Sequence, residues 1–274
     1  MVDATIGHGG HSFLFGRRLG PAGTLVGLDV DSKSLERARQ RLAGLPCKVI
    51  LVKSNFSQIA ERVGELGIKE ADFILADLGL CSAQLTDTEL GLSFRTDMPL
   101  DMRIDESLET TAADIINEFD EESLADLIYR YGQDRASRRI ARYIARRREH
   151  EPITTTGQLA QVVAAALGTP GKKRRSRIHP ATRTFQALRI AVNRELDNLE
   201  QLLEAAPGLL AKDGYVAIIS YHSLEDGLVK RDFKENQAQG IYRVLTKKPI
   251  VPSPEEIAAN HRARSAKLRI ARKN

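Results

Sequence analysis

The stretch of this sequence whose residue types best suit ligand chemistry is a glycine-rich turn near its beginning. Residues 2–6 are apolar enough for a short buried strand, and Gly7, Gly9 and Gly10 follow it. Glycine lets the backbone turn tightly and approach a bound molecule closely, because it has no Cβ. A helix is predicted to open at about His11, and a strand, a glycine turn and a helix N-terminus together form the usual cradle for a nucleotide. The turn by itself also fits a plain connection without a ligand.

An acidic residue about twenty positions later favours a ligand. Residues 24–29 read as a second strand, and Asp29 at its end stands where the ribose hydroxyls of a nucleotide are usually held. The dinucleotide fingerprint would place a third glycine at position 12, which is Ser12 here. This departure disfavours a pyrophosphate ligand and therefore a nicotinamide dehydrogenase. It favours S-adenosylmethionine, whose adenosine carries no phosphate.

The elements that would position such a site alternate along the first 77 residues. Apolar runs at residues 47–52 and 72–77 predict two more strands, and amphipathic stretches at 31–42 and 58–66 predict helices between them. This alternation indicates an α/β fold with a parallel, Rossmann-like sheet, in which ligands bind at the carboxyl ends of the strands. The residues predicted to lie at those ends are Asp3, Asp29, Asn55, Phe56 and Asp77.

After the fourth strand the pattern changes. A loop-like stretch at residues 78–105 precedes four predicted helices, which begin at Thr111 and continue over 121–131, 136–148 and 156–167. In the third of them, the spacing predicts that Ile140, Tyr143 and Ile144 face inward and that the arginines at 135, 138, 139, 142 and 146 face outward. We therefore expect an α/β domain in two parts, residues 1–108 and 182–274, with a helical insert at 109–181.

The second part of the α/β domain is predicted to begin with one long helix at residues 182–210. A turn at Asp213-Gly214 then leads into a strand at 215–220, with His222 just beyond its end. Two last strands are predicted at 241–246 and 266–271, separated by a proline-rich loop.

Charge is distributed unevenly over the 274 residues, although the net charge is only +5. Residues 130–148 hold eight arginines against one aspartate, and residues 172–183 and 260–273 each hold six basic residues and no acidic ones. Such segments are typical of a nucleic-acid surface if they meet on one face, although each could also be a solvated surface.

The remaining composition indicates the compartment. The sequence has neither a membrane-length apolar run nor a secretory leader, so we expect a cytoplasmic protein without a membrane partner. Its two cysteines, Cys47 and Cys81, lack metal-ligand spacing and are expected to be core residues, and no metal site is predicted.

Several stretches of the sequence match one known family in order: Asp3–Gly7 with Gly9–Ser12, Asp29–Asp31, Asp77–Gly79, Ser82–Leu85, Pro99–Arg103, His179–Ile190, His222–Asp226 and Arg264–Arg269. Together they resemble the ribosomal RNA small-subunit methyltransferase H or MraW family. The resemblance covers essentially the whole chain. It implies S-adenosylmethionine-dependent methylation of the exocyclic N4 of one cytidine in the decoding region of 16S rRNA. It also implies a helical substrate-recognition insert and a partner in the small ribosomal subunit, and we consider a homodimer.

The resemblance also implies a methyl-donor pocket. Asp29 would bind the ribose, Phe56 would lie near the adenine, and Asp77 and Gln84 would lie near the methionine end. The backbone of the turn would contribute Gly9, Gly10 and His11. Members of the family usually carry a further segment before the first strand, which this chain lacks. In addition, Leu90 and Gly227 stand where members carry arginine.

A cytosine amine is a poor nucleophile because its lone pair is delocalised into the ring, so a catalyst should offer an acceptor for its proton. We predict Asp77 or Asp101 as that acceptor, with His222 and Glu225 as second candidates. Asp101 could instead form an ion pair with Arg103, and residues 222–226 could be a helix cap.

Two alternatives to this function remain. A DNA amino-methyltransferase is disfavoured because the Pro-Pro-aromatic turn of that class does not follow Asp77. A non-catalytic rRNA-binding assembly factor is the other alternative.

Overall fold

The computed structural model describes residues 1–80, 84, 90–168 and 179–274, and these fall into two compact units. The first unit comprises residues 1–79 and 196–274, and the second comprises residues 80–195. The expected insert of residues 109–181 lies within the second unit. That unit is wider than the expected insert, because Leu100, Met102 and helix α9 (Thr182–Asn193) share its hydrophobic core.

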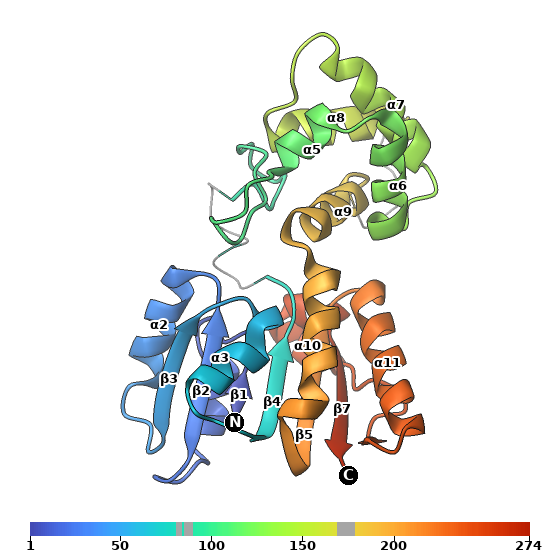
Figure 1. Ribbon diagram of the computed structural model, residues 1–274. Helices are drawn as coiled ribbons and strands as arrows, with labels where there is room; N and C mark the ends of the chain where they lie inside the picture. Colours follow the sequence, from blue (N-terminus) through green and yellow to red (C-terminus); the bar gives the residue numbers. More distant parts are fainter. Residues whose placement is uncertain (81–83, 85–89, 169–178) are drawn as a thin grey trace. The chain divides into compact units, whose positions relative to one another are not determined.

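In the described residues the first unit contains one seven-stranded sheet with the order β3-β2-β1-β4-β5-β7-β6 (Figure 1). Strands β1 to β5 are mutually parallel, whereas β7 runs antiparallel between β5 and β6. The predicted α/β fold is confirmed, and the antiparallel β7 distinguishes this sheet from the dinucleotide-binding order 3-2-1-4-5-6. The strands are β1 (Val2–Asp3), β2 (Thr24–Asp29), β3 (Lys48–Lys53), β4 (Ala71–Asp77), β5 (Leu210–Ser220), β6 (Tyr242–Val244) and β7 (Lys267–Lys273).

The side chains of each strand point alternately to the two faces of the sheet, and this explains why helices cover both faces. In β2, Val26 and Leu28 join the core cluster that contains α3 (Ile59–Glu65), α10 (Glu195–Leu209) and α11 (Ser223–Ala238). The intervening Leu25 joins a separate cluster with Leu35 and Leu42 of α2 (Ser32–Leu42). Successive side chains of a strand point to opposite faces, so an apolar run such as β2 requires a helical layer on each side. Figure 1 shows α10 lying against one face of the sheet, beside β4 and β5.

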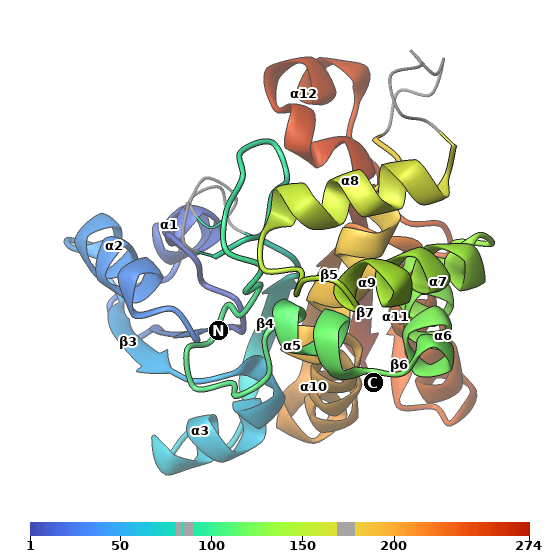
Figure 2. The same cartoon turned by 90° about the horizontal axis from the view of Figure 1, so that it is seen from above.

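The second unit is helical, and its helices begin where the sequence signals them. Thr111 caps α5 (Ala112–Glu118) and Thr155 caps α8 (Thr156–Ala166), each in a capping box with the residue three positions later. Helices α6 (Glu121–Gly132) and α7 (Ser137–Arg148) lie side by side, and α8 packs next to α7 (Figure 2). Their buried residues, which include Leu124, Ile128, Ile140 and Ile144, form one core.

The structure corrects the long helix predicted at residues 182–210. Arg194 has a left-handed backbone (φ 50°) and ends α9, and α10 begins immediately after it at Glu195. The side chain of Asn193 helps to fix this break, because its Nδ2 donates to the carbonyl of Met102 and its Oδ1 accepts from the amide of Ile104. The break also marks the boundary between the two units.

Three smaller predictions were also wrong. Tyr143 does not face inward but is 40% exposed, because Ile140, Ala141 and Ile144 already fill the buried face of α7. Strand β5 starts at Leu210 rather than at residue 215. The proline-rich loop contains a short helix, α12 (Pro254–Ala259), which Ser253 caps.

Two further predictions concern composition. Cys47 is buried as expected, whereas Cys81 and residues 172–178 of the second basic segment lie outside the described residues. Among the helices of the described chain, none is both long and apolar enough to cross a membrane.

Candidate active site

The glycine turn has the backbone geometry that the sequence predicted. Gly7 and Gly9 have positive φ angles of 49° and 73°, a region that residues with a Cβ rarely adopt. Gly9 directly precedes α1 (Gly10–Gly16), and its amide donates to the carbonyl of Ile6 at 2.7 Å. The backbone conformation at Gly9 favours glycine, and a Cβ added there would lie 3.2 Å from Cγ of Leu42, which would have to shift slightly. The glycines therefore serve the tight turn between β1 and α1 and its packing against Leu42.

Asp29 at the end of β2 is tied to this turn. Its Oδ2 accepts the amide N–H of Gly7 at 2.9 Å, and its Oδ1 accepts the amide N–H of Asp31 at 2.9 Å. Burial raises the pKa of Asp29 to about 6, although these amide donors oppose the shift. A carboxylate oxygen can accept two hydrogen bonds, so each oxygen keeps capacity for a further donor such as a ribose hydroxyl.

Asp3 in β1 hydrogen-bonds residues on both sides of the glycine turn, Thr5 and Ser12. It is only 2% exposed, and its Oδ2 accepts the hydroxyl of Ser12 at 2.5 Å while its Oδ1 accepts the amide of Thr5 at 3.2 Å. Burial raises the pKa of Asp3 to about 6. Ser12 occupies the position of the third glycine in the dinucleotide fingerprint, and its buried hydroxyl links α1 to β1 instead. The departure from that fingerprint thus has a structural reason.

Asp77 at the end of β4 lies between two side chains. Its Oδ1 accepts the phenol O–H of Tyr221 at 2.8 Å, and its Oδ2 lies 3.4 Å from Nε2 of His11. Its own amide donates to Oγ1 of Thr5 at 2.7 Å. The hydrogen bond with Asp77 raises the pKa of His11, which favours a charged imidazole. The pKa of Tyr221 is raised by its burial and by the negative charge of Asp77, so its phenol stays a donor.

Tyr221 is the functional candidate that the sequence reasoning did not single out. It stands next to the tip of β5, where the register pairs Asp77 of β4 with Ile219. Adjacent parallel strands bring their carboxyl ends together, so this adjacency was available in principle from the predicted strands. The sequence could not show which side chain beyond Ser220 turns toward β4.

Phe56 follows the end of β3, the neighbour of β2 in the sheet. It opens a short 3-10 helix that Asn55 caps by accepting the amide of Ser57 at 2.9 Å. Its ring is half-buried against the main core of the unit. An aromatic surface at this edge suits a flat heterocycle.

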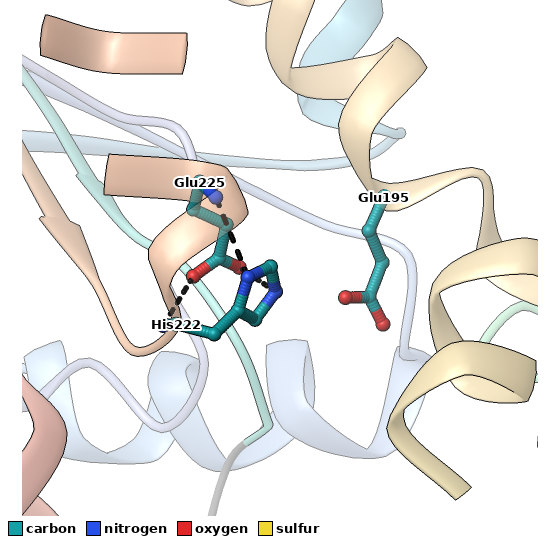
Figure 3. A group of neighbouring side chains, drawn as sticks. All are labelled: Glu195, His222 and Glu225. Carbon is teal, nitrogen blue, oxygen red and sulfur yellow. Dashed lines mark hydrogen bonds and ion pairs between the residues drawn. The ribbon is translucent and has the colours of Figure 1, made fainter. Parts of the chain in front are cut away.

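His222 and Glu225 form the N-terminal cap of α11, as Figure 3 shows. Nδ1 of His222 accepts the amide of Glu225 at 3.3 Å, and Oε2 of Glu225 accepts the amides of Tyr221 and His222 at 2.8 and 3.2 Å. The next residue, Asp226, pairs with Lys267 and Arg269 of β7 at 3.1 and 2.7 Å. The helix-cap alternative for this motif is thus confirmed.

Comparison with known proteins identifies the family. The family model described as the MraW methylase family matches residues 1–274. The chain belongs to the MraW methylase family.

Relatives named ribosomal RNA small subunit methyltransferase H support this membership of the MraW family. The protein of Acidobacterium capsulatum is 50% identical, and the match covers 99% of this chain and 91% of the relative. The protein of Brevibacillus brevis is 45% identical with the same coverage. The protein of Acaryochloris marina is 50% identical over 98% of this chain and 86% of the relative.

In this MraW-family chain, the residues gathered at the strand tips of the first unit fit an S-adenosyl donor. The tight turn at Gly7 and Gly9 follows β1, and Asp29 keeps acceptor capacity beside it. The predicted site residues that the structure brings together in this unit are Gly9, Gly10, His11, Asp29, Phe56, Asp77 and His222.

Asp101 and Gln84 belong to the second unit. Burial would raise the pKa of Asp101, but hydrogen bonds from Arg103 outweigh it and hold that pKa below its usual range. Oδ1 of Asp101 accepts from Nε of Arg103 and Oδ2 from Nη2, each at 2.8 Å, so the ion-pair alternative is confirmed. Gln84 is buried. Roles for Asp101 in catalysis and for Gln84 in donor binding stay predictions.

Proposed function

We propose that this MraW-family protein transfers the methyl group of S-adenosylmethionine to the exocyclic N4 of a cytidine in the decoding region of 16S rRNA. The observation that carries this proposal is the carboxylate of Asp29, anchored to the amide of Gly7 in the glycine turn. This arrangement suits an adenosine that lacks a phosphate, and the relatives of the family are named as rRNA methyltransferases.

The donor would be held by the strand tips. Asp29 would accept the ribose hydroxyls, Phe56 would contact the adenine, and the backbone of Gly9 and Gly10 would allow close approach. The His11–Asp77 pair, with Gln84, would hold the methionine end, where the ligand offers both a carboxylate and an ammonium group. When bound, S-adenosylmethionine supplies an electron-poor methyl group on sulfur.

The chain's own chemistry would then act on the attacking amine. As the N4–carbon bond forms and the carbon–sulfur bond breaks, the amine must lose one proton. We assign this acceptor role first to Asp77, because its oxygens are oriented by Tyr221 and His11 and keep further acceptor capacity. Asp101 comes second because both of its oxygens hold Arg103, and His222 comes third because it caps α11.

The second unit would recognise the RNA, in keeping with the arginine-rich α7. In this proposal the substrate is 16S rRNA within the small ribosomal subunit, and the protein works in the cytoplasm. A homodimer is a further expectation, which light scattering of the purified protein tests.

The decisive experiment measures transfer of labelled methyl from S-adenosylmethionine to small subunits that lack the modification. Nucleosides of the product are separated and identified by mass spectrometry, and N4-methylated cytidine is the expected product. Transfer to another base or atom refutes the assignment. Donor binding without transfer indicates the alternative of a non-catalytic rRNA-binding factor.

Two substitutions made separately test the acceptor. Asp77→Asn is expected to abolish most methyl transfer, whereas Asp101→Asn is expected to keep more of it. Calorimetric titration with S-adenosylhomocysteine shows whether each variant still binds the donor site. Unchanged transfer in Asp77→Asn would remove Asp77 from the mechanism.

A further inference from the structure

We propose that the outward face of α7 binds a single-stranded segment of RNA, with Tyr143 stacked on an unpaired base and neighbouring arginines on its phosphates. This inference rests on the proposed function only in taking RNA as the partner. It names the part of the second unit that would hold RNA and the form of RNA that it would hold.

The geometry of α7 sets an aromatic ring among cations. Ile140, Ala141 and Ile144 are buried in the core of the second unit, so the opposite face of α7 is open to solvent. Tyr143 lies on that face and is 40% exposed. Arg139 precedes it by four positions and Arg146 follows it by three, and such residues are neighbours on a helix surface.

The arginines of α7 divide into two groups by their contacts. Arg147 pairs with Glu151 at 2.7 Å, and Arg148 donates to the carbonyl oxygen of Ile116, so these two arginines serve the fold. Within the described chain, by contrast, Arg138, Arg139 and Arg146 have no carboxylate within ion-pair distance. These three side chains are exposed and remain available to an anion.

Arg142 lies 3.6 Å from Glu121, but both side chains are about half exposed. Solvent and salt screen such a pair strongly, so it offers little neutralisation of the arginine face.

Helix stability explains these arginines only in part. Arg146 stands in the last turn of α7, where the helix dipole favours positive charge. Arg138 and Arg139 stand in the first turn, where the dipole disfavours positive charge and no acidic residue of that turn compensates. Arg138 and Arg142, and likewise Arg142 and Arg146, are like charges four residues apart, which repel. A polyanion on this face would relieve both effects.

The exposed ring of Tyr143 favours single-stranded RNA over duplex RNA as the ligand. A basic face alone would suit any phosphate backbone, whereas an aromatic side chain in the midst of it can stack on a base only if that base is unpaired. The substrate base of the proposed reaction must itself be unstacked to reach a pocket, so an RNA with unpaired bases is already required.

The test uses the full chain and a short fluorescent single-stranded RNA, with a duplex of the same sequence for comparison. Fluorescence anisotropy gives affinities over a range of salt concentrations. Tyr143→Ala is expected to weaken single-strand binding by roughly 5- to 150-fold, the usual value of one base–aromatic stack. Tyr143→Phe should bind like the parent protein, because the ring is kept.

The contribution of the arginines is measured by the salt dependence of RNA binding. Arg139→Gln and Arg146→Gln should each reduce the slope of log affinity against log salt by about 0.7, the value for one phosphate contact on a single strand. Two matched controls lie in the first unit: Tyr215→Ala, at a tyrosine that is 41% exposed, and Arg231→Gln, at an exposed arginine. Neither control should change RNA affinity or the salt slope.

The outcomes separate this inference from the proposed function. Equal single-strand affinity in Tyr143→Ala and the parent overturns the inference, even if methyl transfer to small subunits is observed. Weakened binding by Tyr143→Ala, with thermal stability and S-adenosylhomocysteine affinity unchanged, supports it, even if no methyl transfer is found. If Tyr143→Ala unfolds, the salt slopes of the two arginine variants decide, and unchanged slopes overturn the proposal.

Discussion

The protonation of Asp29 gives the site a pH dependence that can be calculated. Its pKa in the free protein is raised to about 6 by burial. The proposed ribose contact needs acceptors, so the donor should bind the form with an ionised Asp29. Binding therefore weakens as the pH falls through about 6, because protonation of Asp29 competes with it.

The size of the effect follows from the fraction of Asp29 that is ionised. With a pKa of about 6, roughly one molecule in eleven carries the ionised group at pH 5, whereas nearly all carry it at pH 7.5. The dissociation constant for S-adenosylhomocysteine should therefore be about tenfold larger at pH 5 than at pH 7.5. Near pH 6, binding should release about half a proton from this group.

Isothermal titration calorimetry measures both quantities. Affinities are taken between pH 5 and 7.5, and the proton release is obtained at pH 6 from buffers of different ionisation enthalpy. The matched variant is Asp29→Asn, which should bind more weakly at neutral pH and lose most of the change in affinity below pH 6.5. Asp3 titrates in the same range, but its oxygens accept bonds from the turn itself, and the variant leaves that contribution in place.

A flat affinity between pH 5 and 7.5 in the parent protein would refute this reasoning. So would a pH dependence that persists in full in Asp29→Asn, because the titrating group would then be another residue. His11 can be distinguished, since its pKa is raised from 6.5 and its titration lies above that of Asp29.

Three further substitutions follow from the contacts. Gly9→Ala places a Cβ at a backbone with φ of 73°, and should lower the free energy of unfolding by about 1–2 kcal/mol and weaken donor binding, as urea unfolding and calorimetry would show. Tyr221→Phe removes the donor to Asp77 and should lower the methyl-transfer rate about tenfold, with a smaller change in donor affinity; an equal loss of both would contradict an orienting role. Arg269→Met leaves Asp226 without its buried partner and should cost about 3 kcal/mol in urea unfolding, whereas an unchanged midpoint would show that Lys267 suffices.

Local patterns made much of the fold predictable from the sequence. Apolar runs such as residues 24–29 and 72–77 gave strands, because a strand with helices on both faces must be apolar throughout. Asp31 and Thr111 gave helix starts, because their side chains bond backbone amides only two or three residues away. In a parallel sheet these elements bring Asp29 and Asp77 to one edge, so the main acidic groups of the site followed as well.

Other features were decided by tertiary contacts. Tyr221 meets Asp77 across 144 positions of the chain, and Arg194 breaks a helix with no glycine or proline to signal it. Tyr143 is exposed because Ile140, Ala141 and Ile144 occupy the buried face of α7.

The sequence by itself determined the strands, the caps and the acidic residues at the strand ends, because these depend on residues close together in the chain. Only the tertiary structure decided what orients Asp77, where the second unit ends and which side of α7 carries an aromatic ring among arginines. Those features depend on non-local packing, in which space around a side chain is set by residues far away in the sequence.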